Sequence, residues 1–235
     1  MIRLFRSIRQ KLMKEGKMTN YLKYAIGEIL LVVIGILIAL SINNWNENNK
    51  NTKREKAFFV NMLDDLKLDS IRLQEIKSIL ETAVRYKQFF ENYMAGKQTD
   101  KDSLNAHFHK QYNILVDFIP NSTTMDELSS GNGINLISNP VLRRKIVTLY
   151  NNYDVLAIKL KTGKDKGQSI VNYVSQKVPN INDISDSEMT GLLDDRFYTN
   201  QTRMNYLITQ LEAVENAFKQ CLETLEWIKK EINYD

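Results

Sequence analysis

Apolar residues form one uninterrupted run near the start of the chain and recur with helical spacing over most of the remainder. The uninterrupted run covers residues 25–42, where only Glu28 and Ser41 are polar. About eighteen helical residues at about 1.5 Å each span roughly 28 Å, close to the bilayer hydrocarbon thickness of about 30 Å. The run therefore predicts a transmembrane helix.

Residues 51–94 carry two apolar rows with a spacing of seven residues, which predicts a long amphipathic helix. Asp69 and Lys87 interrupt the two rows. Gly96 and the polar residues after it predict the end of this helix. The rows consist of Phe59, Leu66, Leu73, Leu80 and Met94, and of Met62, Ile76, Ala83 and Phe90.

The middle of the chain is less regular and predicts short helices. Thr124 and Glu127 have the spacing of a capping box, which predicts a helix over residues 125–130. Ser185 and Glu188 repeat this spacing and predict another short helix.

Two further long helices are predicted. Asn139 and Pro140 supply an N-cap and a first-turn residue for the first of them, and Gly163 and Gly167 are expected to weaken or bend it. The last helix, over residues 200–232, has two unbroken apolar rows. These rows consist of Met204, Leu211, Phe218, Leu225 and Ile232, and of Leu207, Val214, Cys221 and Ile228.

These elements predict an all-α protein, with one N-terminal transmembrane helix followed by an elongated helical bundle of three long helices plus short helices. We expect a basic cytoplasmic segment over residues 1–24, the transmembrane helix over residues 25–42 and an extracytoplasmic helical-bundle domain over residues 43–235. The same apolar rows also fit an intermolecular coiled coil. Packing within one chain is favoured, because the short helices allow the chain to fold back and the heptads of the first long helix are imperfect.

Composition excludes several classes of protein. With 43% apolar residues, the chain is not disordered. A single cysteine cannot form an intramolecular disulfide, and two histidines leave little material for a zinc site. Only 3 prolines and 9 glycines agree with long helices rather than with many short strands and tight turns.

The net charge of +4 is unevenly distributed. Residues 1–24 hold 7 basic side chains and 1 acid, a charge of +6, and the remaining 25 basic and 27 acidic side chains sum to −2. Because the basic excess lies beside the apolar run, we expect a phospholipid bilayer rather than nucleic acid as its partner. The same excess favours a cytoplasmic N-terminus in the inner membrane and a periplasmic C-terminal domain.

Two alternatives concern the N-terminal end. Residues 1–17 have the pattern of a basic amphipathic helix at the membrane interface, and a disordered basic topology signal is the alternative. The apolar run also resembles a cleaved secretory signal, but its length and the long segment before it favour an anchor.

Several motifs occur in and after the apolar run. They are YAIGEI at residues 24–29, VVIGILIAL at 32–40, INNWNE at 42–47, MDELSSG at 125–131 and INLI at 134–137. Together they resemble an uncharacterised family of small single-pass membrane proteins from Bacteroidota, a domain of unknown function. The resemblance covers most of the chain and implies a topology, but it implies no activity, cofactor or catalytic residue.

No residue pattern predicts catalysis, a cofactor or a metal site, so we expect a protein that is not an enzyme. His107 and His109 would point about 200° apart on a helix and cannot bind one metal together. Cys221 lies in an apolar row, which predicts a buried side chain rather than a nucleophile. The acidic pairs at residues 64–65 and 194–195 are expected on solvated faces.

The transmembrane run contains a candidate contact between membrane helices. Glu28, Gly35 and Ala39 lie close to one helical face, where the small residues would allow close helix approach and Glu28 would be protonated or hydrogen-bonded to a neighbour. A Glu28 side chain that reaches the headgroups beside Lys23 is the alternative. We expect homo-oligomerisation, or docking to another envelope membrane protein, through this face.

These observations predict a membrane-anchored, non-enzymatic scaffold or adaptor that presents an extracytoplasmic interaction domain in the cell envelope. The alternative is a ligand-binding domain for sensing or transport that acts through a partner membrane protein, with a pocket at residues 114–136. A pocket with convergent polar groups would favour the second function, and a large exposed apolar stripe would favour the first.

Overall fold

The computed structural model describes residues 18–97, 108, 110–112, 114, 116–130 and 133–233. Helices account for most of these residues, and the described residues contain no strand, so the all-α prediction is confirmed. The chain divides into two units, residues 1–54 and residues 55–235. The amphipathic helix predicted for residues 1–17 lies outside the described residues.

A single helix, α2 (Met18–Met94), contains both the apolar run and the predicted helix over residues 51–94. It ends where the sequence predicts. Gly96 adopts φ of +70°, its N–H donates to the Tyr93 carbonyl at 2.9 Å, and the Lys97 N–H donates to the Asn92 carbonyl at 2.9 Å. This is a Schellman motif, which only a residue that tolerates left-handed backbone closes without strain.

The short helix α4 (Thr123–Ser129) forms close to the predicted place, but the predicted cap is wrong. Its N-cap residue is Ser122, and Thr124 lies inside the helix, where it is buried. The Thr124 N–H donates instead to Asp65 Oδ2 of α2 at 3.3 Å. A side chain from a distant helix therefore accepts the hydrogen bond that the sequence assigned to a local one. A 3-10 turn, η1 (Gly133–Leu136), follows.

The helix α5 (Pro140–Ser175) begins as predicted. Asn139 Oδ1 accepts hydrogen bonds from the backbone N–H groups of Val141 and Leu142 at 3.0 and 3.2 Å, and Pro140 occupies the first turn. An apolar stripe along this helix is buried. It consists of Leu142, Ile146, Leu149, Tyr153, Leu156 and Leu160, resumes with Ile170 and Val174, and is followed after the end of the helix by the buried Val178.

Gly163 and Gly167 do not end α5, which runs through both of them. Both glycines are buried, and they allow close contacts. A Cβ at Gly163 would meet the Gln210 side chain at 2.0 Å, and one at Gly167 would meet the Tyr112 carbonyl oxygen at 3.1 Å. These glycines are therefore points of close packing, and the expectation of a weakened helix missed this role.

The capping box of Ser185 and Glu188 is confirmed at the start of α6 (Asp186–Asp194). The predicted helix over residues 200–232 is wrong at its start, because α7 (Arg196–Thr202) and α8 (Tyr206–Asn233) are separate helices. Asp195 caps α7 by accepting from the Phe197 and Tyr198 N–H groups. This local cap sets the helix start, although the apolar rows alone suggest one continuous element.

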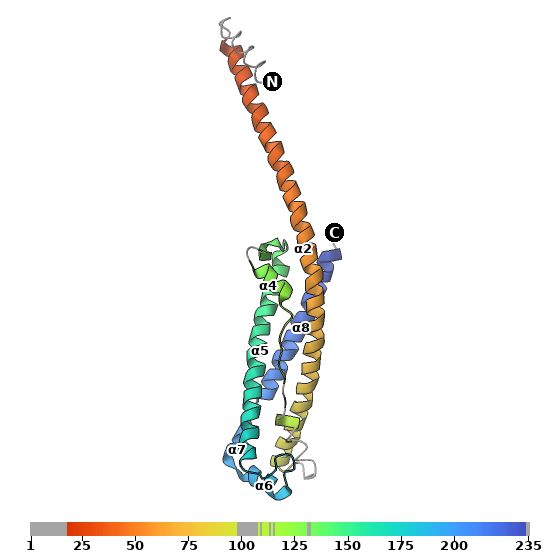
Figure 1. Cartoon of the computed structure of the whole chain (residues 1–235), viewed down its shortest axis with the longest axis vertical. Helices are drawn as coiled ribbons and strands as arrows, with labels where there is room; N and C mark the ends of the chain where they lie inside the picture. The colour runs from red at the N-terminus through yellow and green to blue at the C-terminus, as the bar shows by residue number, and fades with distance from the viewer. Residues whose placement is uncertain are drawn as a thin grey trace. The chain divides into compact units, whose positions relative to one another are not determined.

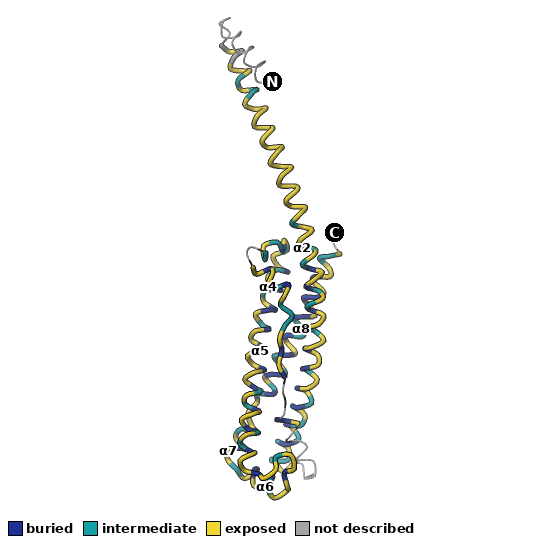
Figure 2. The backbone as a smooth tube through the Cα atoms, in the orientation of Figure 1, coloured by how far each residue is buried: buried dark blue, intermediate teal, exposed yellow. Residues whose placement is uncertain are grey.

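Within residues 55–235, α2, α5 and α8 run lengthwise beside one another, with α6 and α7 at the end of the unit opposite the C-terminus (Figure 1). Their apolar rows are buried in one chain, as expected for intramolecular packing (Figure 2). On α8 the row from Leu207 to Ile228 is buried as predicted. Of the other predicted row, from Met204 to Ile232, only Leu225 is buried. Gln210, Ala217 and Thr224 are buried in place of the other residues of that row.

Lys87, which interrupts a predicted row of α2, is nevertheless buried, with 1% of its surface exposed. Its ammonium forms an ion pair with Glu91 one turn later. The aromatic side chains of Phe90 and Tyr198 pack edge to face at 6.1 Å in a second core cluster that includes residues of α6 and α7. The ion pair with Glu91 therefore allows the charged Lys87 to lie among the apolar residues of the α2 row.

The contact between Gly163 and Gln210 yields a test by double substitution. We expect Gly163→Ala to destabilise the fold, because the new methyl group displaces Gln210 Nε2 from the Lys159 and Leu160 carbonyls, which it contacts at 3.2 and 3.0 Å. In a Gln210→Ala background the same change should be neutral or stabilising, since alanine favours a helix over glycine by about 1 kcal/mol. Thermal unfolding followed by Trp fluorescence measures both effects.

Gly191→Ala is the matched control, because a Cβ at this exposed position of α6 meets nothing within 4 Å. Equal destabilisation by Gly163→Ala in both backgrounds would contradict the assignment of Gln210 as the group that requires glycine.

Candidate functional site

The predicted membrane contact residues Glu28, Gly35 and Ala39 all lie in the apolar part of α2. At about 100° per residue they fall within an arc of about 40° on one helix face. Gly35 and Ala39 are exposed, and a Cβ at Gly35 would meet nothing within 4 Å. The face is thus available for a second helix, and whether one binds there stays a prediction.

His107 and His109, the histidine pair considered from the sequence, lie outside the described residues. Among the residues that the structure describes, no group of three or more His, Cys, Asp or Glu side chains could hold a metal ion. Of the acidic pairs expected on solvated faces, Asp64 and Asp194 are exposed as expected, whereas Asp65 and Asp195 are half-buried. Asp65 accepts from the start of α4, and Asp195 caps α7, so each of these two carboxylates has a structural role.

Among the described residues of the bundle, the most buried carboxylate is that of Asp69 of α2, which has no exposed surface. Its Oδ1 accepts from the Asn121 backbone N–H at 2.9 Å and from Asn121 Nδ2 at 2.8 Å. The Asn121 carbonyl in turn accepts from the Tyr150 hydroxyl at 3.0 Å. Asp69 therefore ties the segment before α4 to both α2 and α5.

Burial raises the pKa of the Asp69 carboxyl above its usual value of 3.8, because loss of solvent disfavours the charged form. The two hydrogen bonds from Asn121 oppose this shift. Burial likewise raises the pKa of Tyr150 and of Tyr153 beside it. Burial therefore disfavours the charged forms of Asp69, Tyr150 and Tyr153.

Cys221 of α8 belongs to the same region and is buried, as the sequence predicts. Its thiol donates to the Leu66 carbonyl at 3.3 Å and lies beside Tyr153. Burial raises the pKa of the thiol to about 11, so it is protonated at neutral pH. A protonated, inaccessible thiol is a poor nucleophile. These contacts fix the core and provide no catalytic arrangement.

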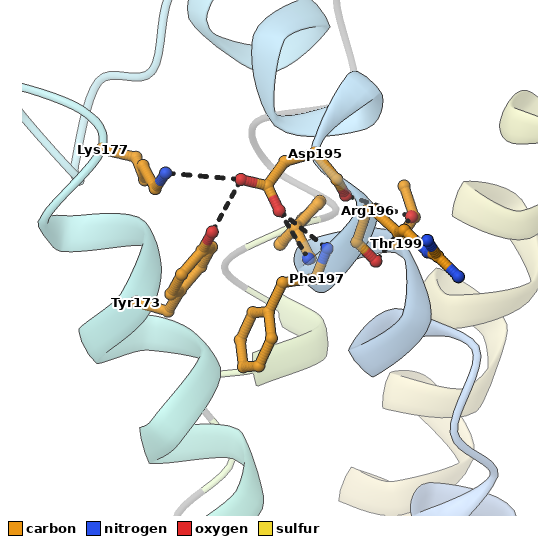
Figure 3. A network of polar contacts seen from close by, with 7 residues as sticks. Tyr173, Lys177, Asp195, Arg196, Phe197 and Thr199 are labelled. Carbon is orange, nitrogen blue, oxygen red and sulfur yellow. Dashed lines mark hydrogen bonds and ion pairs between the residues drawn. The ribbon is translucent and has the colours of Figure 1, made fainter.

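A groove of about 410 Å³ lies where the end of α5 meets α7. Beside it, Asp195 Oδ2 accepts a hydrogen bond from the Tyr173 hydroxyl at 2.6 Å and pairs with Lys177 Nζ at 3.5 Å (Figure 3). Asp195 Oδ1 accepts from the Phe197 and Tyr198 N–H groups at 2.9 and 3.0 Å. One carboxylate thus joins the cap of α7 to the side chain of Tyr173. The groove is lined by Asp165, Gln168, Ser169, Asn172, Tyr173, Gln176 and Phe197.

These contacts also set the protonation states beside the groove. The hydrogen bond from Tyr173 lowers the pKa of Asp195, with help from the Tyr198 N–H. The same bond raises the pKa of Tyr173, and contact with Tyr173 raises the pKa of Lys177. At neutral pH the carboxylate is charged and the tyrosine is a hydrogen-bond donor, which keeps the aromatic ring in a fixed position.

The described residues of the range 114–136, where the sequence predicts a pocket for the alternative function, include several core side chains. Val116, Phe118 and Leu128 are buried, and the Phe118 ring packs against Tyr153 at 4.9 Å. The groove at α5 and α7 draws none of its lining from this segment. Asp195 could have been anticipated as a helix cap, but nothing in the sequence brings α7 to the end of α5.

On the bundle part of α2, Val60, Leu68, Ile71 and Ile79 are exposed apolar side chains. At about 100° per residue they fall within an arc of about 100°, a sector that also includes the exposed acidic residue Glu75. This helix face is therefore mixed in character, in contrast to the uniformly apolar run earlier in α2.

One helix of the described residues is long and apolar enough to cross a membrane, and none of its apolar window is buried. Together with the bundle, this helix defines an all-α protein compatible with membrane anchoring. The chain belongs to the family of unknown function DUF6090, whose sequence profile matches residues 28–201. No curated protein and no solved structure matches the chain. The matched region includes the apolar run from Glu28 onward, Asp69 and all residues that line the groove.

Asp69 yields a prediction in which charge and hydrogen bonding are separated. Asp69→Asn keeps the acceptor for Asn121 but removes the charge, so we expect a higher melting temperature at neutral pH. Asp69→Leu removes the acceptor and should destabilise the fold by about 1–3 kcal/mol. Thermal unfolding of the full chain in detergent measures both changes.

The sign of the pH dependence follows from the raised pKa. The contribution of Asp69 to the free energy of unfolding is fully present below the pKa that its carboxyl has in the unfolded chain. It is lost as the pH rises through the higher pKa that the carboxyl has in the folded chain. The advantage of Asp69→Asn should therefore shrink as the pH falls from neutral to mildly acidic. If Asp69→Asn raised the melting temperature by the same amount at neutral and mildly acidic pH, the result would contradict a raised pKa of the buried Asp69 carboxyl.

Proposed function

We propose that this protein is a membrane-anchored, non-enzymatic adaptor, with its N-terminus in the cytoplasm and its helical bundle in the periplasm. The bundle would present an interaction domain in the cell envelope, while the helix over residues 25–42 holds it at the inner membrane. The proposal rests on two observations. The apolar helix favours a membrane location, and the sequence contains no residue pattern that predicts catalysis.

The unburied apolar run carries this proposal. None of its 18-residue window is buried within the chain, and Leu31 and Ile38 expose 65% and 55% of their surface. Transfer of one such side chain out of water is worth about 1.5–3 kcal/mol. A run of this length is therefore unfavourable in water and favourable in hydrocarbon.

The structure of the bundle supports a division of roles between a membrane anchor and an interaction domain. Residues 55–235 bury the apolar rows of α2, α5 and α8 against one another, so this unit has a core of its own. The unit needs no membrane to cover those rows. An anchor joined to a self-contained domain is the arrangement that an adaptor requires.

The face of Glu28, Gly35 and Ala39 supplies the contact to the partner in this proposal. Small residues at 35 and 39 permit close approach of a second membrane helix, and a carboxylic acid in hydrocarbon favours a hydrogen-bonding partner. A second copy of this chain is the proposed occupant, and a different membrane protein on the same face is one outcome of the crosslinking test.

A second candidate function is ligand binding through the bundle. The groove between α5 and α7 favours it, because several polar side chains of α5 line one open groove beside two aromatic rings. In this case the bundle would bind a ligand and the anchor would transmit its state to a membrane partner.

Orientation is tested by labelling introduced cysteines with a membrane-impermeant maleimide. We expect Ser187→Cys, exposed in α6, to react in cells whose outer membrane is permeabilised, and Thr19→Cys to react only after the inner membrane is lysed. The native Cys221 is buried and provides an internal blank. The reverse labelling pattern would contradict the orientation, and release of a shortened soluble chain would contradict the anchor.

The adaptor role is tested by crosslinking the full tagged chain in native membranes, followed by purification and identification of the crosslinked species. We expect a dimer band that decreases on Gly35→Ile, because the larger side chain blocks close helix approach, and on Glu28→Ala, which removes the polar contact. Leu37→Ile, on the opposite helix face, is the matched control.

Recovery of another membrane protein that is lost with the same two variants would place a different partner on this face. Crosslinking that is indifferent to both Gly35→Ile and Glu28→Ala would contradict the proposed contact.

A further inference from the structure

The groove between α5 and α7 combines an aromatic surface with several uncharged polar groups. Tyr173 and Phe197 bring their ring centroids to 4.4 Å with an interplanar angle of 45°. Phe197 exposes 46% of its surface, whereas its neighbour Tyr198 is fully buried in the second core cluster. The chain thus leaves part of a phenyl ring exposed at the edge of the groove, where a ligand would cover it.

The Tyr173 side chain and the Phe197 backbone are held in place before any ligand binds. Asp195 accepts from the Tyr173 hydroxyl and from the Phe197 N–H, so one side chain connects both aromatic residues (Figure 3). Lys177 Nζ lies 5.2 Å from the centre of the Tyr173 ring on the same network. Groups that are ordered in advance lose less freedom on binding.

The polar lining offers both donors and acceptors. Gln168 Nε2 donates to Asn172 Oδ1 at 2.9 Å, which sets the orientation of both amides. Gln168 Oε1 and Asn172 Nδ2 then remain as an acceptor and a donor for a further partner. Ser169 and Asp165 add a hydroxyl and a carboxylate to the lining.

The chemistry of the lining selects among ligand classes. The described residues that line the groove include one carboxylate and no lysine or arginine, which disfavours an anion. Amide, hydroxyl and carboxylate groups bind neighbouring hydroxyls, and an aromatic ring covers the apolar face of a small ring compound. The volume of about 410 Å³ falls within the range of about 300–1,000 Å³ that is usual for small-ligand sites.

We propose that this groove binds a neutral saccharide, with a sugar ring against Phe197 and Tyr173 and its hydroxyls on Gln168, Asn172 and Asp165. The inference deepens the second candidate function and does not depend on the adaptor contact of the membrane helix. Failure of the crosslinking test would leave it intact, and failure of the saccharide test would leave the adaptor contact intact.

The test uses the full chain in lipid nanodiscs, because detergents with sugar headgroups would compete for the groove. Saturation-transfer NMR and titration calorimetry are performed with maltotriose and with N,N′-diacetylchitobiose as probes. We expect transfer to the ring protons of at least one probe. Phe197→Ala should weaken its binding roughly tenfold, which corresponds to about 1.4 kcal/mol.

Asn172→Ala should weaken binding of the same probe while it leaves the melting temperature unchanged, since Asn172 is exposed on α5. Trp227→Ala, a change of another exposed aromatic residue outside the groove, is the matched control and should bind as the unchanged protein does. Absence of transfer to both probes would overturn the proposal. Binding that is unaffected by both Phe197→Ala and Asn172→Ala would also overturn it.

Discussion

Hydrogen bonds to carboxylates of α2 from the segment that leads from residue 114 to the start of α5 are the interactions on which the rest of the bundle depends. Asp69 accepts from Asn121, and Glu55 accepts from the Ser138 N–H at 2.7 Å and from its hydroxyl at 2.9 Å. Residues 116–122 and 137–139 lie outside the helices, so their N–H groups need partners other than an intrahelical ladder. Acidic side chains of α2 supply them at Asn121 and at Ser138, with α4 and η1 in between, and α5 begins directly after the second.

The position of α5 determines how the other helices of the bundle pack. Its first turn is fixed by Asn139, whose Nδ2 also donates to Glu231 of α8 at 3.0 Å, so the start of α5 is linked to α2 and α8 together. Farther along, Gly163 lets Gln210 of α8 lie against the helix. The end of α5 then meets α7 and forms the groove. The proposed ligand site therefore depends on side-chain contacts made at the opposite end of the same helix.

Local signals in the sequence predicted the helices and several of their ends, but not the contacts between distant residues. The caps at Asn139 and Ser185 were predictable, because each depends on residues within one turn. The break between α7 and α8 was not, since the apolar row that begins at Met204 gives no sign that the helix starts only at Tyr206. The role of Gly163 depends on Gln210, far along the chain, and the groove depends on the meeting of α5 and α7. The interruption at Asp69 was visible in the sequence as a polar residue in an apolar row, and its partner was not.

Native-state hydrogen exchange of the full chain tests the anchoring of this segment most directly. If the α2 carboxylates hold it, the amides of Asn121 and Ser138 exchange only in the openings that expose the core amides of α5 and α8. The amide of Ile119, a residue with 82% of its surface exposed, serves as an internal reference for a less protected position of the same segment. Exchange of Asn121 and Ser138 as fast as that reference would contradict the claim that buried carboxylates of α2 organise the bundle.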